Sequence, residues 1–168
     1  ASTTINTETA VAGALKGVEI GVAGSGFRFM GNTMLAIGEA EPMTSAPVLI
    51  SGAANDILVS NNYIAACNPG TSVLGLIAVT AAATNVRIIG NQLVQLETAG
   101  TALFTVTVGA VAATGVIGYN NSQIGTDVTA TTSGVTVNSA AAATMLVVEN
   151  RTNDAAANRQ AVLSPVVA

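Results

Sequence analysis

Carboxylates are the side chains in this sequence that are best suited to chemistry. Nine acidic residues are spread over 168 positions. Glu39 and Glu41 share one side of a segment expected to be extended, and Glu97 follows at a comparable place further along. Glycoside hydrolysis needs two carboxyl groups at one bond, one protonated and one ionised. These three glutamates are therefore candidate acids for cleaving a polysaccharide, although loop charges in solvent are the simpler interpretation. Asp56 and Glu149 fall in expected turns.

Other catalytic arrangements lack their essential residues. Because the sequence has no histidine, it holds no Ser-His-Asp or Cys-His relay and no histidine ligand for a metal. The glycine-rich phosphate-binding patterns are also missing. Sugar-binding grooves commonly use exposed aromatic rings, and only Tyr63 and Tyr119 are expected at the surface. The sequence thus predicts that the protein is not an enzyme and has no cofactor or metal, unless an active site is shared between chains.

The composition argues against several classes of partner. Half of the residues are apolar and 8% are charged, so a disordered chain is not expected. With five basic residues and a net charge of −4, the chain lacks the positive patch that binds nucleic acid or an anionic membrane. No apolar run reaches the roughly 18 residues that span a bilayer. Cys67 stands alone, so no internal disulfide is possible, and we expect it to be a small buried filler.

A seven-residue segment recurs five times and organises the chain. It reads GFRFMGN at 26–32, DILVSNN at 56–62, NVRIIGN at 85–91, GVIGYNN at 115–121 and TMLVVEN at 144–150. The closing residues form a column of asparagines: Asn32, Asn62, Asn91, Asn121 and Asn150. The repeat of 29 or 30 residues indicates stacked supersecondary units. Because stacked asparagines form ladders along parallel strands, this column is the predicted structural Asn ladder.

Two further families of expected strands flank these segments at the same step. One family precedes the segments: Val18–Val22, Val48–Ile50, Leu76–Val79, Thr105–Val108 and Val135–Val137. The other follows them: Met34–Ile37, Ile64–Cys67, Leu93–Leu96 and, less clearly, Ile124–Val128. Three strands per repeat predict an all-β fold, a parallel β-helix of about five three-stranded coils, whereas a sandwich of hairpins would not explain matched columns one coil apart. The expected limits are an N-terminal cap over 1–17, the β-helix over 18–152, and a C-terminal cap and tail over 153–168, the pattern stopping after the last asparagine.

One column of the repeated segment is expected to point away from the core. It holds Arg28, Leu58, Arg87, Ile117 and Leu146. Phe27 and Phe29 fall in the inward columns, so they are expected in the core. Outward leucine and isoleucine side chains form a candidate interface, because large exposed apolar patches usually mark contact with a partner. Ordinary surface apolarity is the alternative.

The bend asparagines and the segments VRIIGNQL and ILVSNNYI resemble the repeats of the right-handed β-helix in pectate-lyase-like proteins and bacteriophage tailspikes. The resemblance covers about residues 18–152 and implies a right-handed parallel β-helix (a β-solenoid). The basic and acidic clusters with which pectate lyases bind Ca²⁺ are not visible. The resemblance is to an architecture, and architecture alone does not determine activity.

The resemblance to tailspikes implies a place in a bacteriophage virion. We expect a non-catalytic structural protein, a capsid decoration or cement protein, that forms a homotrimer and binds other virion proteins such as the capsid protein. The alternatives are a tail fibre or tailspike segment, possibly a polysaccharide depolymerase using Glu39, Glu41 and Glu97, and a secreted adhesin or ice-binding solenoid. Ice binding requires regular threonine arrays, and Thr105, Thr107 and Thr136 do not recur in every coil.

Overall fold

The computed structural model describes eight segments of the chain and contains seventeen short strands there, without a helix. The described segments are residues 4–6, 17–35, 46–65, 75–95, 105–124, 134–137, 144–153 and 162–163. The predictions for Cys67, Glu39, Glu41 and Glu97 lie outside them. In the described part of the chain, no helix has the length and hydropathy needed to cross a membrane.

The strands form three parallel sheets, here named A, B and C. Sheet A contains β1 (Thr4–Asn6), β4 (Thr33–Leu35), β7 (Tyr63–Ala65), β10 (Gln92–Gln95), β13 (Asn121–Ile124) and β16 (Arg151–Asn153). Sheet B contains β2 (Val18–Ile20), β5 (Val48–Ile50), β8 (Ile77–Val79), β11 (Val106–Val108), β14 (Val135–Val137) and β17 (Val162–Leu163). Sheet C contains β3 (Arg28–Met30), β6 (Asn55–Ser60), β9 (Thr84–Ile89), β12 (Gly115–Gly118) and β15 (Met145–Val148).

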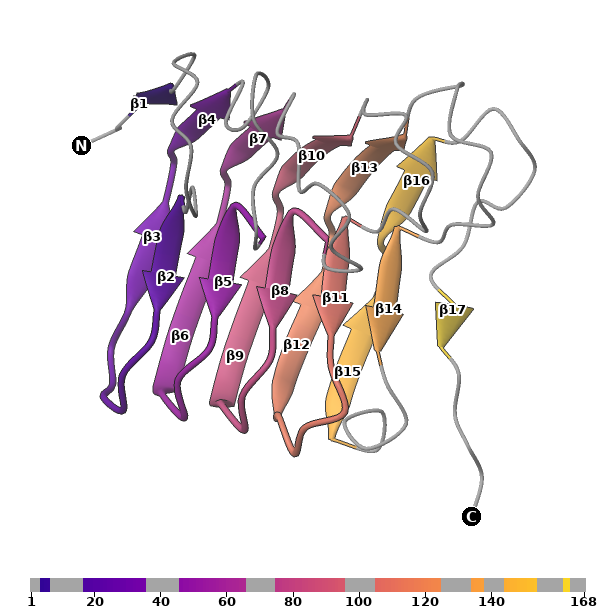
Figure 1. Ribbon diagram of the computed structural model, residues 1–168. Coiled ribbons are helices and arrows are strands. Elements are labelled where there is room, and N and C mark those ends of the chain that lie inside the picture. Colours follow the sequence, from indigo (N-terminus) through magenta and orange to yellow (C-terminus); the bar gives the residue numbers. More distant parts are fainter. Residues whose placement is uncertain are drawn as a thin grey trace.

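The chain visits the sheets in the order B, C, A and then begins the next coil. Each strand pairs with its equivalents one coil away, as when Ile57 of β6 lies beside Val86 of β9. In Figure 1 the chain descends through the nearer strands of sheet B and ascends through the farther strands of sheet C while the coils advance from left to right. This winding is right-handed. The predicted right-handed parallel β-helix is confirmed.

The core lies between the three sheets and consists of the inward side chains of every coil. The largest fully buried side chains are Met34, Ile50, Ile57, Ile64, Leu76, Ile77, Ile88, Leu93 and Ile117. Most are β-branched or leucine, which suits a pleated surface. Burying one such side chain contributes about 1.5–3 kcal/mol. Phe27 and Phe29 are partly buried and pack against this core near its N-terminal end.

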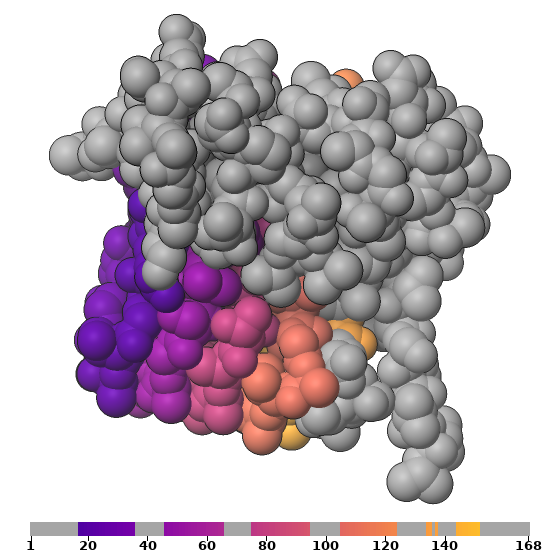
Figure 2. Space-filling model, viewed as in Figure 1, coloured from indigo at the N-terminus to yellow at the C-terminus, as the bar shows by residue number. Residues whose placement is uncertain are grey.

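Sheet B is buried on both faces, whereas sheet C has one exposed face. The outward positions of sheet B include Leu49, Ala78 and Thr107, all of which are buried, and Leu49 packs with Ala46 and Ala78 in a second small apolar cluster. On sheet C the outward positions are partly or fully exposed. Figure 2 shows the described side chains of successive coils as adjoining bands over the lower part of the molecule. The uncovered face of sheet C is therefore the better-placed of the two for contact with a partner.

The fourth repeat is shifted by one residue from the predicted alignment. β12 pairs with β9 so that Val116 lies beside Arg87 on the outward face. Ile117 consequently points into the core and is fully buried, and the prediction that it faces outward is wrong. Since a strand has a two-residue period, a slip by one residue sends every side chain to the opposite face. The repeat therefore reads TGVIGYN, over 114–120.

Gly115 holds this register at the start of β12. Its φ of 148° is a conformation that side chains disfavour, and an added Cβ would lie 1.8 Å from the carbonyl oxygen of Val86. The preceding Thr114 accepts a hydrogen bond from the backbone N–H of Asn85 through its Oγ1 (3.0 Å). Glycine is thus required at the position that the predicted alignment assigned to a turn.

Three strands differ from the predicted boundaries. β13 begins at Asn121, three residues before the predicted start, because it follows directly on the bend. β16 continues sheet A after Asn150, where the pattern was expected to stop. At the two ends, β1 pairs with β4 and β17 pairs with β14, so the sheets continue beyond the range 18–152.

Candidate functional site

A ladder of buried asparagines joins the coils at the bend between sheets C and A. In Asn62, the backbone N–H and the side-chain Nδ2 both donate to Oδ1 of Asn91, at 3.1 and 2.9 Å. The same pair of bonds recurs from coil to coil along Asn32, Asn62, Asn91, Asn120 and Asn150. Four of these are the predicted ladder residues. Asn120, and not Asn121, takes the fourth place, because the repeat there is shifted by one.

The ladder is saturated with hydrogen bonds, so its role is structural. Nδ2 of Asn91 also donates to the carbonyl of Val59 (3.0 Å), and Nδ2 of Asn120 donates to that of Ile88 (2.9 Å). Each amide therefore satisfies buried backbone and side-chain groups together. The ladder leaves little capacity for binding a ligand.

The residues just before the ladder all have positive φ. Gly31, Asn61 and Gly90 have φ of 64°, 53° and 66°, and these residue types tolerate the left-handed region. In the last two coils the same place is held by Tyr119 and Glu149, with φ of 56° and 41°. Tyrosine and glutamate are disfavoured there, at a cost of about 1–2 kcal/mol each. The bend is thus locally strained at the C-terminal end of the helix.

An ion-pair cluster spans three coils at the opposite bend, where sheet C begins. Oδ2 of Asp56 lies 2.6 Å from Nη2 of Arg28, and Oδ1 lies 2.6 Å from Nη2 of Arg87. Nδ2 of Asn85 also donates to Oδ1 of Asp56 (3.1 Å). The hydrogen bond from Arg28, and then the charges of both arginines, lower the pKa of Asp56 below its ordinary value despite some desolvation. Asp56 is thus a turn residue with φ of 54°, as predicted, and also the centre of a charged cluster.

The two arginines are held in place rather than free. Nη1 of Arg28 donates to the carbonyls of Asp56 and Phe27, at 2.6 and 2.9 Å. Nε of Arg87 is buried and has no hydrogen-bond partner in the described segments. Both guanidinium side chains are still 36–40% exposed. The cluster therefore gives one end of the sheet C face a fixed charge pattern.

The outward face of sheet C is apolar beyond this cluster. Its outward residues, in coil order, are Arg28, Leu58, Arg87, Val116 and Leu146 in one column and Met30, Ser60, Ile89, Gly118 and Val148 in the next. Leu146 is 59% exposed and Met30 is 44% exposed. Four of the five predicted interface residues lie on this face, and Val116 replaces Ile117.

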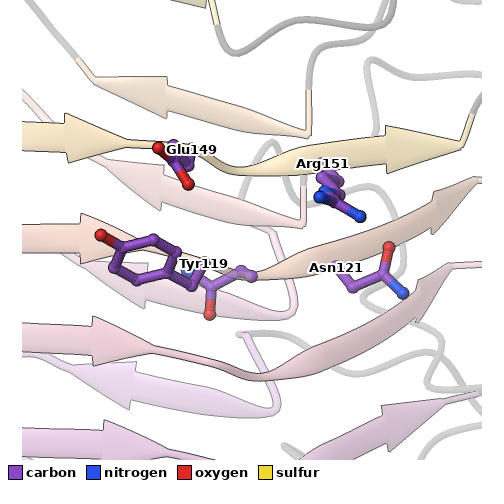
Figure 3. A pocket seen from close by; sticks show the side chains of 5 residues that line it. Tyr119, Asn121, Glu149 and Arg151 are labelled. Carbon is purple, nitrogen blue, oxygen red and sulfur yellow. The ribbon is translucent and has the colours of Figure 1, made fainter.

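A shallow hollow opens beside the ladder at the C-terminal end of the helix. Its lining comes from two neighbouring coils, and its volume is about 300 Å³. The lining residues are Tyr119, Asn120, Asn121, Glu149 and Arg151. Figure 3 shows Tyr119 and Glu149 close together over the bend, with Asn121 and Arg151 on the strands that follow. The repeat pattern did not reveal this grouping, since Asn121 was assigned to the ladder and Arg151 to the tail.

Metal-binding groups were also sought. Within the described segments, no three histidine, cysteine, aspartate or glutamate side chains come together. The comparisons with protein-family models, with curated proteins and with solved structures found no match. The functional argument therefore starts from the chemistry of the exposed face and the hollow.

Proposed function

We propose that this chain is a non-catalytic structural protein of a bacteriophage virion, a capsid decoration protein that docks through the outward face of sheet C. The observation that carries this proposal is the uncovered apolar strip on that face, in which Leu58, Val116 and Leu146 lie in one column. Exposed apolar strips of this kind usually mark contact with another protein. Sheet B offers no such strip because its outward positions are buried within the chain.

The mechanism is passive and depends on stiffness. Parallel strands, a filled core and the asparagine ladder tie every coil to its neighbours. A surface carried by such a body loses little conformational entropy when it binds, so more of the contact energy appears as affinity. The protein would reinforce a capsid by bridging its subunits, acting as a homotrimer.

The charged cluster sets the orientation of docking. Arg28, Asp56 and Arg87 lie toward the N-terminal end of the face, and Val116 and Leu146 lie toward the C-terminal end. Burying paired charges is costly, whereas charges at the rim direct association and specificity. The apolar C-terminal half is therefore the centre of the proposed contact, and the cluster is its rim.

Binding to emptied capsids tests the proposal. Purified protein is mixed with capsids stripped of decoration, and the bound fraction is measured by co-sedimentation. Leu146→Asp places a charge in the centre of the contact and should weaken binding by at least about tenfold. Tyr63→Asp changes an exposed residue of sheet A and is the matched control. Equal binding by both variants, or no binding by the unmodified protein, contradicts the proposal.

A tail fibre or tailspike segment is the second candidate, and the hollow beside Tyr119 favours it because tail proteins contact cell-surface polymers. The copy number per virion, measured by quantitative mass spectrometry, separates many decoration copies from few tail copies. The depolymerase form of this candidate requires Glu39, Glu41 and Glu97. Replacing all three with glutamine should abolish cleavage of capsular polysaccharide if that form is correct.

A further inference from the structure

We infer that the hollow lined by Tyr119, Asn121, Glu149 and Arg151 is a binding site for a neutral sugar ring, a pyranose unit of a polysaccharide. The inference goes beyond the proposed docking function and does not depend on it, since the hollow lies at the bend between sheets C and A. The residues come from two adjacent coils and border one opening of about 300 Å³. That volume is at the lower end of the range for small-molecule sites.

The first support is the residue choice at the bend. The first three coils place Gly31, Asn61 and Gly90 at the left-handed position, which suits their conformational freedom. The last two coils place Tyr119 and Glu149 there, against the backbone preference of both residues. Strained residues concentrate where function requires a particular side chain. Both misfits border the same hollow, so one functional requirement explains them together.

The second support is the set of chemical groups that the hollow presents. Tyr119 is 59% exposed and offers a ring face, and a pyranose has an apolar face that packs on such a ring. Asn121 supplies both donors and an acceptor, Glu149 supplies acceptors and Arg151 supplies donors. These match sugar hydroxyls, which donate and accept. In the described part of the chain, none of these four side chains has a hydrogen bond or an ion pair, so their polar groups are available.

The same groups disfavour other ligands. A phosphate or nucleic acid would meet the Arg151 guanidinium but also the carboxylate of Glu149, and the protein has a net charge of −4. A metal ion would find one carboxylate and a nearby cation in place of an oxygen-ligand cage. Cleavage of the sugar is not implied, because glycoside hydrolysis uses two carboxyl groups and the lining holds one. A neutral, hydroxyl-rich ring fits the set best.

Chemical-shift mapping tests the inference. Isotope-labelled protein is titrated with the methyl glycosides of glucose, galactose, mannose and N-acetylglucosamine, to about 50 mM because single rings commonly bind in the millimolar range. At least one glycoside should shift the resonances of Tyr119, Asn121 and Arg151 and leave those of Arg28 and Asp56 in place. If no glycoside shifts the hollow residues, the inference is overturned.

Two variants separate binding from folding. Tyr119→Asn and Glu149→Gly restore residues that tolerate positive φ, so each should raise the melting temperature. Each should also weaken binding of the responding glycoside by about tenfold or more, because a ring face or an acceptor is lost. Tyr63→Ala is the control, since Tyr63 is an exposed tyrosine outside the hollow. Binding by Tyr119→Asn that equals that of the control, or a lowered melting temperature in both bend variants, overturns the inference.

Discussion

Single residues in this protein act on neighbours that are a whole coil away. Asp56 lies in one coil and binds arginines of the coils before and after it. Asn120 accepts from the coil before it through Oδ1, at 3.0 and 2.9 Å, and donates to Oδ1 of Asn150 in the coil after it, at 2.8 Å. Because each contact crosses a coil boundary, a substitution at either residue tests the stacking itself.

The charge of Asp56 gives a prediction about pH. The arginines lower the pKa of Asp56 below its ordinary value of 3.8, so the ionised carboxylate stabilises the folded state above that value. This contribution is lost as the pH falls through the lower, folded-state pKa. Asp56→Asn should therefore be less stable than the unmodified protein at neutral pH, and the difference should vanish in strong acid. Urea unfolding across this pH range measures it.

Salt provides the control for this prediction. The cluster is partly exposed, so at about 1 M salt, where the screening length is about 3 Å, the difference at neutral pH should shrink. A difference that is unchanged by both acid and salt would show that Asp56 acts only through the turn.

Adjacent asparagines give a second prediction. Asn120 is 1% exposed and serves the ladder, whereas the side chain of Asn121 is exposed. Asn120→Ala leaves buried donors and acceptors without partners and should lower the free energy of unfolding by about 3 kcal/mol. Asn121→Ala should change it by about 0.5 kcal/mol or less. Denaturant unfolding of both variants checks this, and equal losses would contradict the register of the fourth coil.

At the scale of elements, the short strands are defined by which face they bury. β12 directs Ile117 inward and Val116 outward, although both are apolar and β-branched. Composition does not distinguish the two residues. Their roles follow from pairing with β9, where Ile117 lies beside Ile88 and Val116 beside Arg87.

Truncating the two residues tests that assignment. Ile117→Ala removes buried methyl groups and leaves a cavity, so the free energy of unfolding should fall by about 2–5 kcal/mol. Val116→Ala, on the outward face, should lower it by less than about 1 kcal/mol. The ratio of the two losses, measured by urea denaturation, reports the register, and the reverse order would restore the alignment predicted from the sequence.

At the scale of the whole molecule, each coil contacts only its neighbours, as in other solenoids. The interior strands β6 and β9 have a partner on each side in sheet C, whereas β3 and β15 are the first and last strands of that sheet. The ends of the stack therefore have fewer interactions to break than its middle.

Hydrogen exchange tests this picture of the stack. Amides of β9 should exchange most slowly, and those of β3 and β15 should exchange faster because terminal coils open without disturbing the middle. Mass spectrometry of the exchanging protein resolves the three strands. Uniform protection from β3 to β15 would show instead that the coils unfold as one cooperative unit.

Much of the fold was predictable because the repeat is local and periodic. The strands Val48–Ile50 and Val135–Val137 occur with the predicted bounds, and the ladder was predicted at four of its five positions. The fourth repeat was misaligned because Asn120 and Asn121 are adjacent and either could close the segment. Within the candidate site, the exposed tyrosine Tyr119 was recognised, but its neighbours in the hollow were not.

The sequence by itself determined the period, the three strands of each coil and the alternation of core and surface, since these depend on spacing along the chain. Only the tertiary structure decided which residues meet across coils: the cluster around Asp56, the hollow beside Tyr119 and the burial of both faces of sheet B. The physical reason is registry. A contact between residues about 30 positions apart depends on how one coil settles on the next, and a shift by one residue exchanges the inward and outward faces.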